Sequence, residues 1–158
     1  MNRRDLLRGL ALSLPGSVSL AADHDAVAVV RATYEASLQA DKQKAGMSEE
    51  KFLAPFSLQL RTLWRVSRGN LSPTAPVGPK LHAHYGTGVL PGHAVTLQRI
   101  SLESANASQA VVAVALTVRG APRLIRVDLA REDETWRIAN FRYPDDNYVA
   151  HLNRAMGQ

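Results

Sequence analysis

The sequence contains no cysteine. A disulfide therefore cannot stabilise the fold, and the acylated cysteine of a bacterial lipoprotein is absent as well. Long apolar runs are also missing, because no segment beyond the N-terminus approaches the roughly 20 residues that a membrane-spanning helix needs. We expect stability to come from packing alone, and we expect no membrane span and no cofactor.

The first 22 residues have the layout of a cleavable export signal. A basic head that includes Arg3 and Arg4 precedes a short apolar stretch, which Pro15 interrupts and which ends in small residues at Ala22. The arginine pair resembles the twin-arginine export motif of bacteria. The sequence therefore predicts a signal peptide over residues 1–22, a periplasmic location and a single domain over residues 23–158. An ordinary N-terminal helix or a signal with a chance arginine pair is the alternative.

The charge of the chain is small and spread out. The 158 residues carry a net charge of +5, and loss of the predicted signal leaves 16 basic and 13 acidic residues, a net charge of +3. Such a charge does not indicate nucleic acid as a partner, whereas a small anionic ligand is compatible with it.

Two helical segments are expected in the first half of the chain. Residues 26–40, capped by Asp23 or Asp25, repeat apolar side chains at helical spacing. A second helix opens at Ser48, and Pro55 predicts a kink or a break within it. After it, residues 69–93 contain five glycines and four prolines, which indicates a long irregular connection.

The second half of the chain predicts an antiparallel sheet. Four segments are rich in β-branched residues and are separated only by short turn sequences: 94–104, 108–119, 122–131 and 135–143. The pattern is typical of a meander. In the third segment Ile125, Val127 and Leu129 are expected to face the helices, with Arg126 and Asp128 on the other face.

The order of helix, kinked helix, long loop and meander, closed by the W-x-I sequence of Trp136 to Ile138, resembles the nuclear transport factor 2-like superfamily. This superfamily is also called SnoaL-like or ketosteroid-isomerase-like, and the chain is most similar to its small exported bacterial members of unassigned function. The resemblance implies an α+β fold with a curved antiparallel sheet of about four strands around N-terminal helices, cone-like with a cavity. A cystatin-like sheet packed on one helix is the alternative.

Candidate ligand-binding residues follow from the positions of the aromatic side chains. Tyr34, Trp64 and Trp136 are candidates for lining a pocket or for the core. Asn140 shares a face with Trp136 and Ile138 unless a bulge shifts the register of the last strand. There it is either a pocket hydrogen-bonding group or a satisfied core amide.

Catalytic and metal-binding candidates are few. Asp128 is a candidate general base, although strand alternation places it on the outer face as a cross-strand charge, and His84 is a second candidate. His82 and His84 would project to one side of an extended segment, and with His93 they are the candidate ligands of a zinc or copper site. No Asp, Glu or Cys stands nearby and the spacing matches no standard metal motif, so we expect no metal.

Three functions remain open at this point. We favour an exported ligand-binding or accessory protein that holds a small, largely apolar or anionic ligand, because no convergent catalytic set is visible. A small proton-transfer enzyme of the isomerase or dehydratase type, using Asp128 or a loop histidine, is the first alternative. The second is a protein-protein interaction module, such as an immunity-type protein or an envelope complex subunit.

The outer face of the sheet, with Val111, Ala113 and Ala115, would be covered in a homodimer.

Overall fold

The computed structural model describes residues 20–43, 46–69, 81–88 and 95–157. The elements follow one another as α1 (Leu20–Lys42), α2 (Glu49–Leu53), α3 (Leu58–Gly69), β1 (Leu81–His82), β2 (Thr87–Gly88), β3 (Val95–Ala105), β4 (Gln109–Val118), β5 (Ala121–Glu132), β6 (Thr135–Arg142) and α4 (Tyr148–Ala155). In these ranges no helix is both long and apolar enough to cross a membrane.

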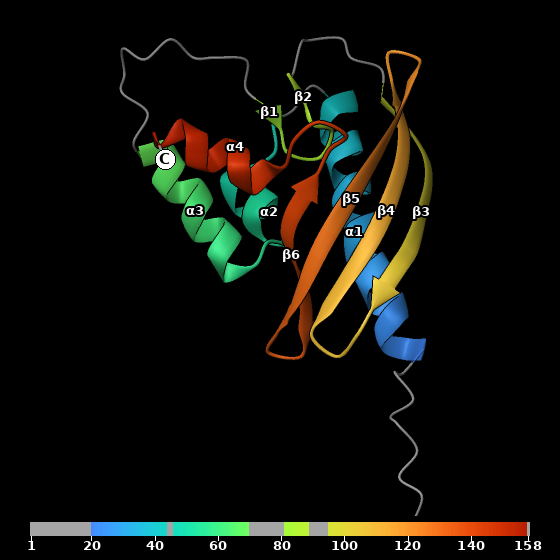
Figure 1. Ribbon diagram of the computed structural model, residues 1–158. Coiled ribbons are helices and arrows are strands. Elements are labelled where there is room, and N and C mark those ends of the chain that lie inside the picture. The colour runs from blue at the N-terminus through green and yellow to red at the C-terminus, as the bar shows by residue number, and fades with distance from the viewer. Residues whose placement is uncertain (1–19, 44–45, 70–80, 89–94, 158) are drawn as a thin grey trace, which may run out of the picture.

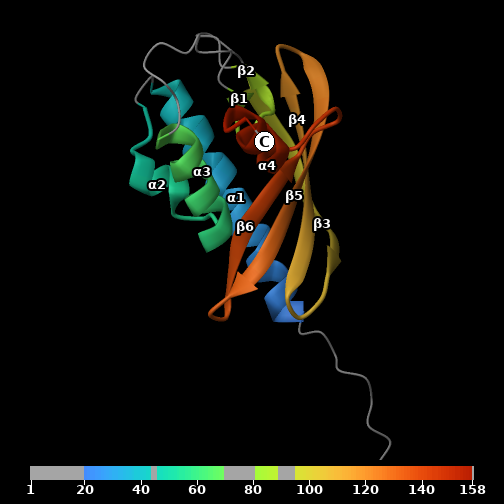
Figure 2. The same ribbon diagram turned by 60° about the vertical axis from the view of Figure 1, so that its left-hand side comes forward.

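The four long strands form one antiparallel meander in the order β3-β4-β5-β6, as the sequence predicts. The sheet curves, and the helices lie on one of its faces (Figures 1 and 2). Ile125, Val127 and Leu129 of β5 are buried toward the helices, and Arg126 is exposed on the other face. The predicted α+β class, with a curved sheet packed against helices, is confirmed.

A bulge in β6 changes which of its residues face the helices. Asp128 pairs with Asn140 but Leu129 pairs with Ile138, so Ala139 is an extra residue in β6. The shift brings Phe141 to the buried side together with Ile138, and it puts Asn140 opposite the outward Asp128. Asn140 therefore does not share the face of Ile138, which was the expectation for a regular strand.

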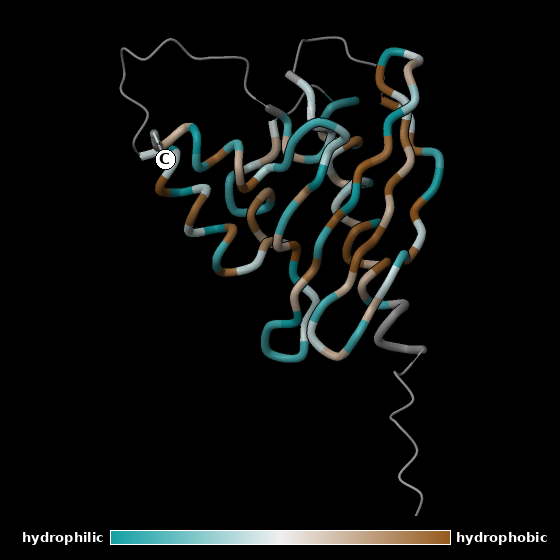
Figure 3. The backbone as a smooth tube through the Cα atoms, viewed as in Figure 1, coloured by the Kyte–Doolittle hydropathy of each residue, from teal (hydrophilic) through white to brown (hydrophobic). Residues whose placement is uncertain are grey.

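Helix α1 lies against the concave face of the sheet. Ala26, Val30 and Tyr34 are completely buried, and their spacing of four residues gives the helix one apolar side. Apolar positions fill the middle of β4, apolar and hydrophilic positions alternate along β5, and hydrophilic residues gather at the hairpin between β5 and β6 (Figure 3). The helix begins at Leu20, before the capping positions Asp23 and Asp25 that the sequence suggested.

Pro55 separates the second predicted helix into α2 and α3. Ser48 caps α2, where its Oγ accepts a hydrogen bond from Lys51 N at 3.4 Å. Between the two helices the backbone pairs with β6 instead: Ile138 N donates to Pro55 O and Ser57 N donates to Ile138 O, both at 2.8 Å. This pairing fixes α2 and α3 at the β6 edge of the sheet, beside α4 (Figure 1).

Candidate functional site

The site is built around a buried turn in the segment that was expected to be a long irregular loop. Strands β1 and β2 pair as a short hairpin, and the turn between them is closed by Gly86 N donating to His82 O at 2.8 Å. Ala83, His84 and Tyr85 of this turn are each at most 5% exposed. Loops usually lie on the surface because buried backbone polar groups need partners, so this turn requires anchors.

Three side chains from distant elements supply these anchors. Tyr34 of α1 donates its hydroxyl to His84 O at 2.8 Å, Tyr143 donates to Ala83 O at 2.5 Å, and Arg123 donates from Nη2 to Gly86 O at 2.6 Å. Burial raises the pKa of both tyrosine hydroxyls, so they remain protonated donors at neutral pH. The helix and the sheet therefore hold the turn rigidly between them.

Close packing at Gly86 fixes the end of the same turn. Gly86 has a φ of +61°, and a Cβ added there would lie 2.2 Å from Cδ1 of Tyr143. Only glycine combines this left-handed conformation with room for the tyrosine ring. The turn thus depends on both the backbone freedom and the absence of a side chain at this position.

The imidazole of His84 lies in an aromatic environment. Its ring centroid is 5.4 Å from that of Phe141, 5.6 Å from that of Phe52 and 5.7 Å from that of Tyr34. Burial, followed by the neighbouring His82, lowers the pKa of His84 from 6.5 to about 3. The ring is therefore neutral at physiological pH.

A chain of hydrogen bonds connects His84 to the surface of α1. His84 Nδ1 lies 2.9 Å from Ser37 Oγ, Ser37 Oγ lies 3.1 Å from the Tyr85 hydroxyl, and that hydroxyl donates to Asp41 Oδ2 at 2.8 Å. Ser37 and Asp41 are one helical turn apart on α1, so both reach the same side of the docked turn. The chain fixes the orientation of the imidazole ring.

Beside this buried turn lies an apolar groove with a volume of about 350 Å³. One wall is α1, through Val29, Ala32, Thr33 and Ala36, and the other is formed by α2, the link that follows it and the start of β6. Phe52, Pro55 and Trp136 are the large apolar members of that second wall, and His84 also lines the groove. We call this site the α1–α2 groove.

Nε2 of His84 is the notable polar atom at this site. It is buried and has no hydrogen-bond partner among the described residues, whereas Nδ1 is engaged with Ser37. Buried polar atoms are normally paired, because an unpaired one costs about 1–3 kcal/mol. Thr33 of the groove wall has its hydroxyl directed to Val29 O at 2.8 Å. The groove thus combines an apolar lining with the imidazole of His84, whose buried Nε2 has no hydrogen-bond partner among the described residues.

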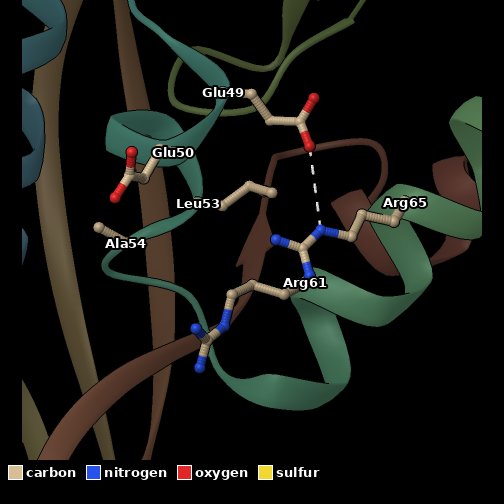
Figure 4. Close-up of a pocket in the computed structure, with 6 residues that line it drawn as sticks. All are labelled: Glu49, Glu50, Leu53, Ala54, Arg61 and Arg65. Atoms are coloured by element: carbon tan, nitrogen blue, oxygen red, sulfur yellow. Dashed lines mark ion pairs between the residues drawn. The ribbon is translucent and has the colours of Figure 1, made fainter.

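A second cleft, of about 310 Å³, separates α2 from α3 (Figure 4). Two carboxylates, Glu49 and Glu50, line it together with the guanidinium groups of Arg61 and Arg65. Glu49 and Arg65 approach to 3.9 Å, and both side chains are more than half exposed. Opposite charges balance each other in this cleft, so it offers neither an apolar nor a strongly anion-selective surface.

The predicted ligand-binding residues are distributed over different parts of the molecule. Trp136 lines the α1–α2 groove. Tyr34 does not line the groove, but its hydroxyl donates a hydrogen bond to the backbone of His84, which does. The ring centroids of Trp64 and Phe52 are 5.8 Å apart. The guanidinium carbon of Arg68 lies over the Trp64 ring, 5.2 Å from its centroid. Asn140 accepts a hydrogen bond from Val149 N at 3.1 Å, which secures the start of α4.

The catalytic and metal candidates that the structure describes do not converge. Asp128 accepts hydrogen bonds from Arg142 on the sheet face opposite the helices, with Arg142 Nη2 at 2.8 Å. The ring of His82 stacks on that of Tyr85, with 4.1 Å between the ring centroids. His82 and His84 do not share an extended strand, because the chain turns after His82. His93 lies outside the described residues, and within those residues no group of three or more His, Cys, Asp or Glu side chains could hold a metal ion.

Sequence reasoning missed Ser37, Asp41 and Tyr85 as parts of this site. Ser37 and Asp41 are ordinary polar residues on a helix, and their partners lie more than 40 residues away in the chain. Tyr85 stands beside the noted histidines, and its position immediately before Gly86 was the available signal for a tight turn.

Comparisons with known proteins leave the family open. No protein-family model matches the chain, and no curated protein matches it. One similar solved structure is a phospholipid-binding protein from Ralstonia solanacearum in complex with a phospholipid. It is 11% identical, the alignment covers 85% of this chain and 80% of that chain, and the TM-score is 0.37. A likeness at this level carries no argument about the ligand of the present chain, and the resemblance to the nuclear transport factor 2-like superfamily stays a prediction.

Proposed function

We propose that this chain is a binding protein that holds a small, largely apolar ligand in the α1–α2 groove. The observation that carries the proposal is the coincidence of an apolar groove with an unpartnered, buried His84 Nε2. Ligand sites generally combine an apolar lining with a few placed polar groups. Such a ligand would bury the apolar walls and would also give Nε2 the partner that the chain itself does not provide.

The charges around the groove tolerate an anionic group on the ligand. Lys51, which is exposed, and Arg137, which is half-buried, both line the groove, while no carboxylate does so among the described residues. An amphipathic molecule could therefore place its apolar part between α1 and Phe52 with an acidic group near these cations.

The geometry favours binding over proton transfer. His84 is a poor general base because burial lowers its pKa to about 3, well below the pH at which a catalytic base should be poised. Asp128, the other candidate, is paired with Arg142 on the opposite face of the sheet from the groove. We propose export to the periplasm as well, on the basis of the signal-like residues 1–22, and N-terminal sequencing of the mature protein would test it.

A fluorescent probe with an apolar ring system and an anionic group, 1-anilinonaphthalene-8-sulfonate, tests the proposed groove. Ala36 is exposed on the α1 wall, so Ala36→Phe should fill the groove without disturbing the core. Gln39→Phe, at another exposed position of α1, is the matched control. We expect the wild-type chain and the control to bind the probe and Ala36→Phe to bind it at least tenfold more weakly. Equal binding by all three would refute the groove as the site.

A further inference from the structure

The direction of the hydrogen bonds between His84 and Asp41 can be worked out from their donors. The Tyr85 hydroxyl has one proton, and it donates that proton to the Asp41 carboxylate. In its contact with Ser37 the Tyr85 oxygen must then accept, so Ser37 donates its own single proton to Tyr85. The Ser37 oxygen is left as an acceptor toward His84.

This direction determines the tautomer of His84. A neutral imidazole has one N–H and one bare nitrogen, and the contact with the accepting Ser37 oxygen at 2.9 Å requires the proton on Nδ1. Nε2 therefore carries a lone pair and can only accept a hydrogen bond. The low pKa of His84, caused first by burial, keeps Nε2 unprotonated at neutral pH.

We infer that the ligand of the α1–α2 groove presents a hydrogen-bond donor, a hydroxyl or an N–H group, to Nε2 of His84. The inference rests on the proposed function, because it describes the ligand of that same groove. It also predicts selectivity: a ligand of the same shape with an acceptor in place of the donor would set two lone pairs against each other in a site shielded from water.

Indole and benzofuran form a matched pair of probes for this selectivity. Both are flat bicyclic molecules, but indole has an N–H where benzofuran has an ether oxygen. We expect the wild-type chain to bind indole about three- to tenfold more tightly than benzofuran in calorimetric titrations, as one net hydrogen bond allows. In His84→Phe, which keeps an aromatic ring and removes the acceptor, this preference should disappear.

The tautomer itself is measurable without any ligand. Long-range proton–nitrogen correlation NMR on the full wild-type chain distinguishes a protonated Nδ1 from a protonated Nε2. We expect the Nδ1–H form for His84. This readout stays decisive even where His84→Phe does not fold.

Each outcome separates the two proposals. Equal affinity for indole and benzofuran, or an Nε2–H tautomer, overturns the donor requirement while the groove remains a binding site. Binding of neither probe, or binding that Ala36→Phe leaves unchanged, refutes the proposed function and the donor requirement with it.

Discussion

Acid should destabilise this protein through His84 in particular. The pKa of His84 is lowered by burial from 6.5 to about 3 in the folded chain, and it returns to its ordinary value on unfolding. Between these two values the unfolded chain binds a proton that the native chain does not. Stability is therefore retained above pH 6.5 and lost progressively as the pH falls toward 3.

The size of the effect follows from the shift. Well inside this window each pH unit costs about 1.4 kcal/mol, and the slope is smaller near pH 6.5, where the unfolded histidine is half protonated. His84 alone should therefore lower the free energy of unfolding by about 2.5 kcal/mol between pH 7.0 and pH 4.5. Burial also lowers the pKa of His82, so protonation of His82 in the unfolded chain further lowers the free energy of unfolding in acid. The Asp41 carboxylate faces His82 and opposes part of that second shift.

Urea unfolding at pH 7.0 and pH 4.5, on the wild-type chain and on His84→Phe, isolates the contribution of His84. The difference between the two proteins cancels the titration of the carboxylates and of the histidines that are remote from His84. Between pH 7.0 and pH 4.5 we expect the free energy of unfolding of His84→Phe to fall by about 2.5 kcal/mol less than that of the wild type. His151→Gln, a change at a partly exposed histidine, should show much less difference. An identical acid dependence in the wild type and His84→Phe would refute a buried, neutral His84.

Three other substitutions test the packing around the site. Ser37→Ala removes the partner of His84 Nδ1 and should cost about 1–3 kcal/mol of unfolding free energy in urea titrations, with Ser104→Ala as an exposed control. Gly86→Ala forces a left-handed residue and a clash with Tyr143, so we expect a loss of at least about 2 kcal/mol; a neutral effect in thermal unfolding would contradict the turn geometry. Asp128→Asn breaks a partly exposed ion pair with Arg142, and it should cost less than about 1 kcal/mol and leave probe binding unchanged.

The sheet was predictable because its signals are local. Each strand alternates or is uniformly apolar, and the turn residues stand at the strand ends, so the predicted boundaries agree with β3 to β6 within one or two residues. Pro55 likewise marked the break between α2 and α3, since proline removes a backbone donor from a helix.

The register of β6 was not predictable in the same way. The bulge at Ala139 leaves no distinct pattern of residue types, yet it moves Asn140 to one face and Phe141 to the other. The sequence allows a bulge in this strand, but only the pairing with the neighbouring strand shows at which residue the bulge occurs.

The site was predictable only in part. Trp136, one of the aromatic candidates for a pocket, lines the α1–α2 groove, and His84 was noted, although for chemistry that its burial disfavours. What the sequence does not show is that the turn between His82 and Gly86 is buried, because its anchors Tyr34 and Tyr143 lie 50 and 60 residues from the carbonyls they hold. Long-range packing thus gives ordinary polar residues of α1 a role in holding the turn beside the proposed binding site.

NMR mapping of indole on the isotope-labelled full chain tests the central claim most directly, because it reports where a ligand binds. Binding in the α1–α2 groove predicts shifts in the amides from Val29 to Ala36, in Phe52 and Trp136, and in the His84 side chain, all absent in Ala36→Phe. Shifts that cluster instead at Arg61 and Arg65 of the α2–α3 cleft, or no shifts at saturating indole, would contradict the claim that this groove is the binding site.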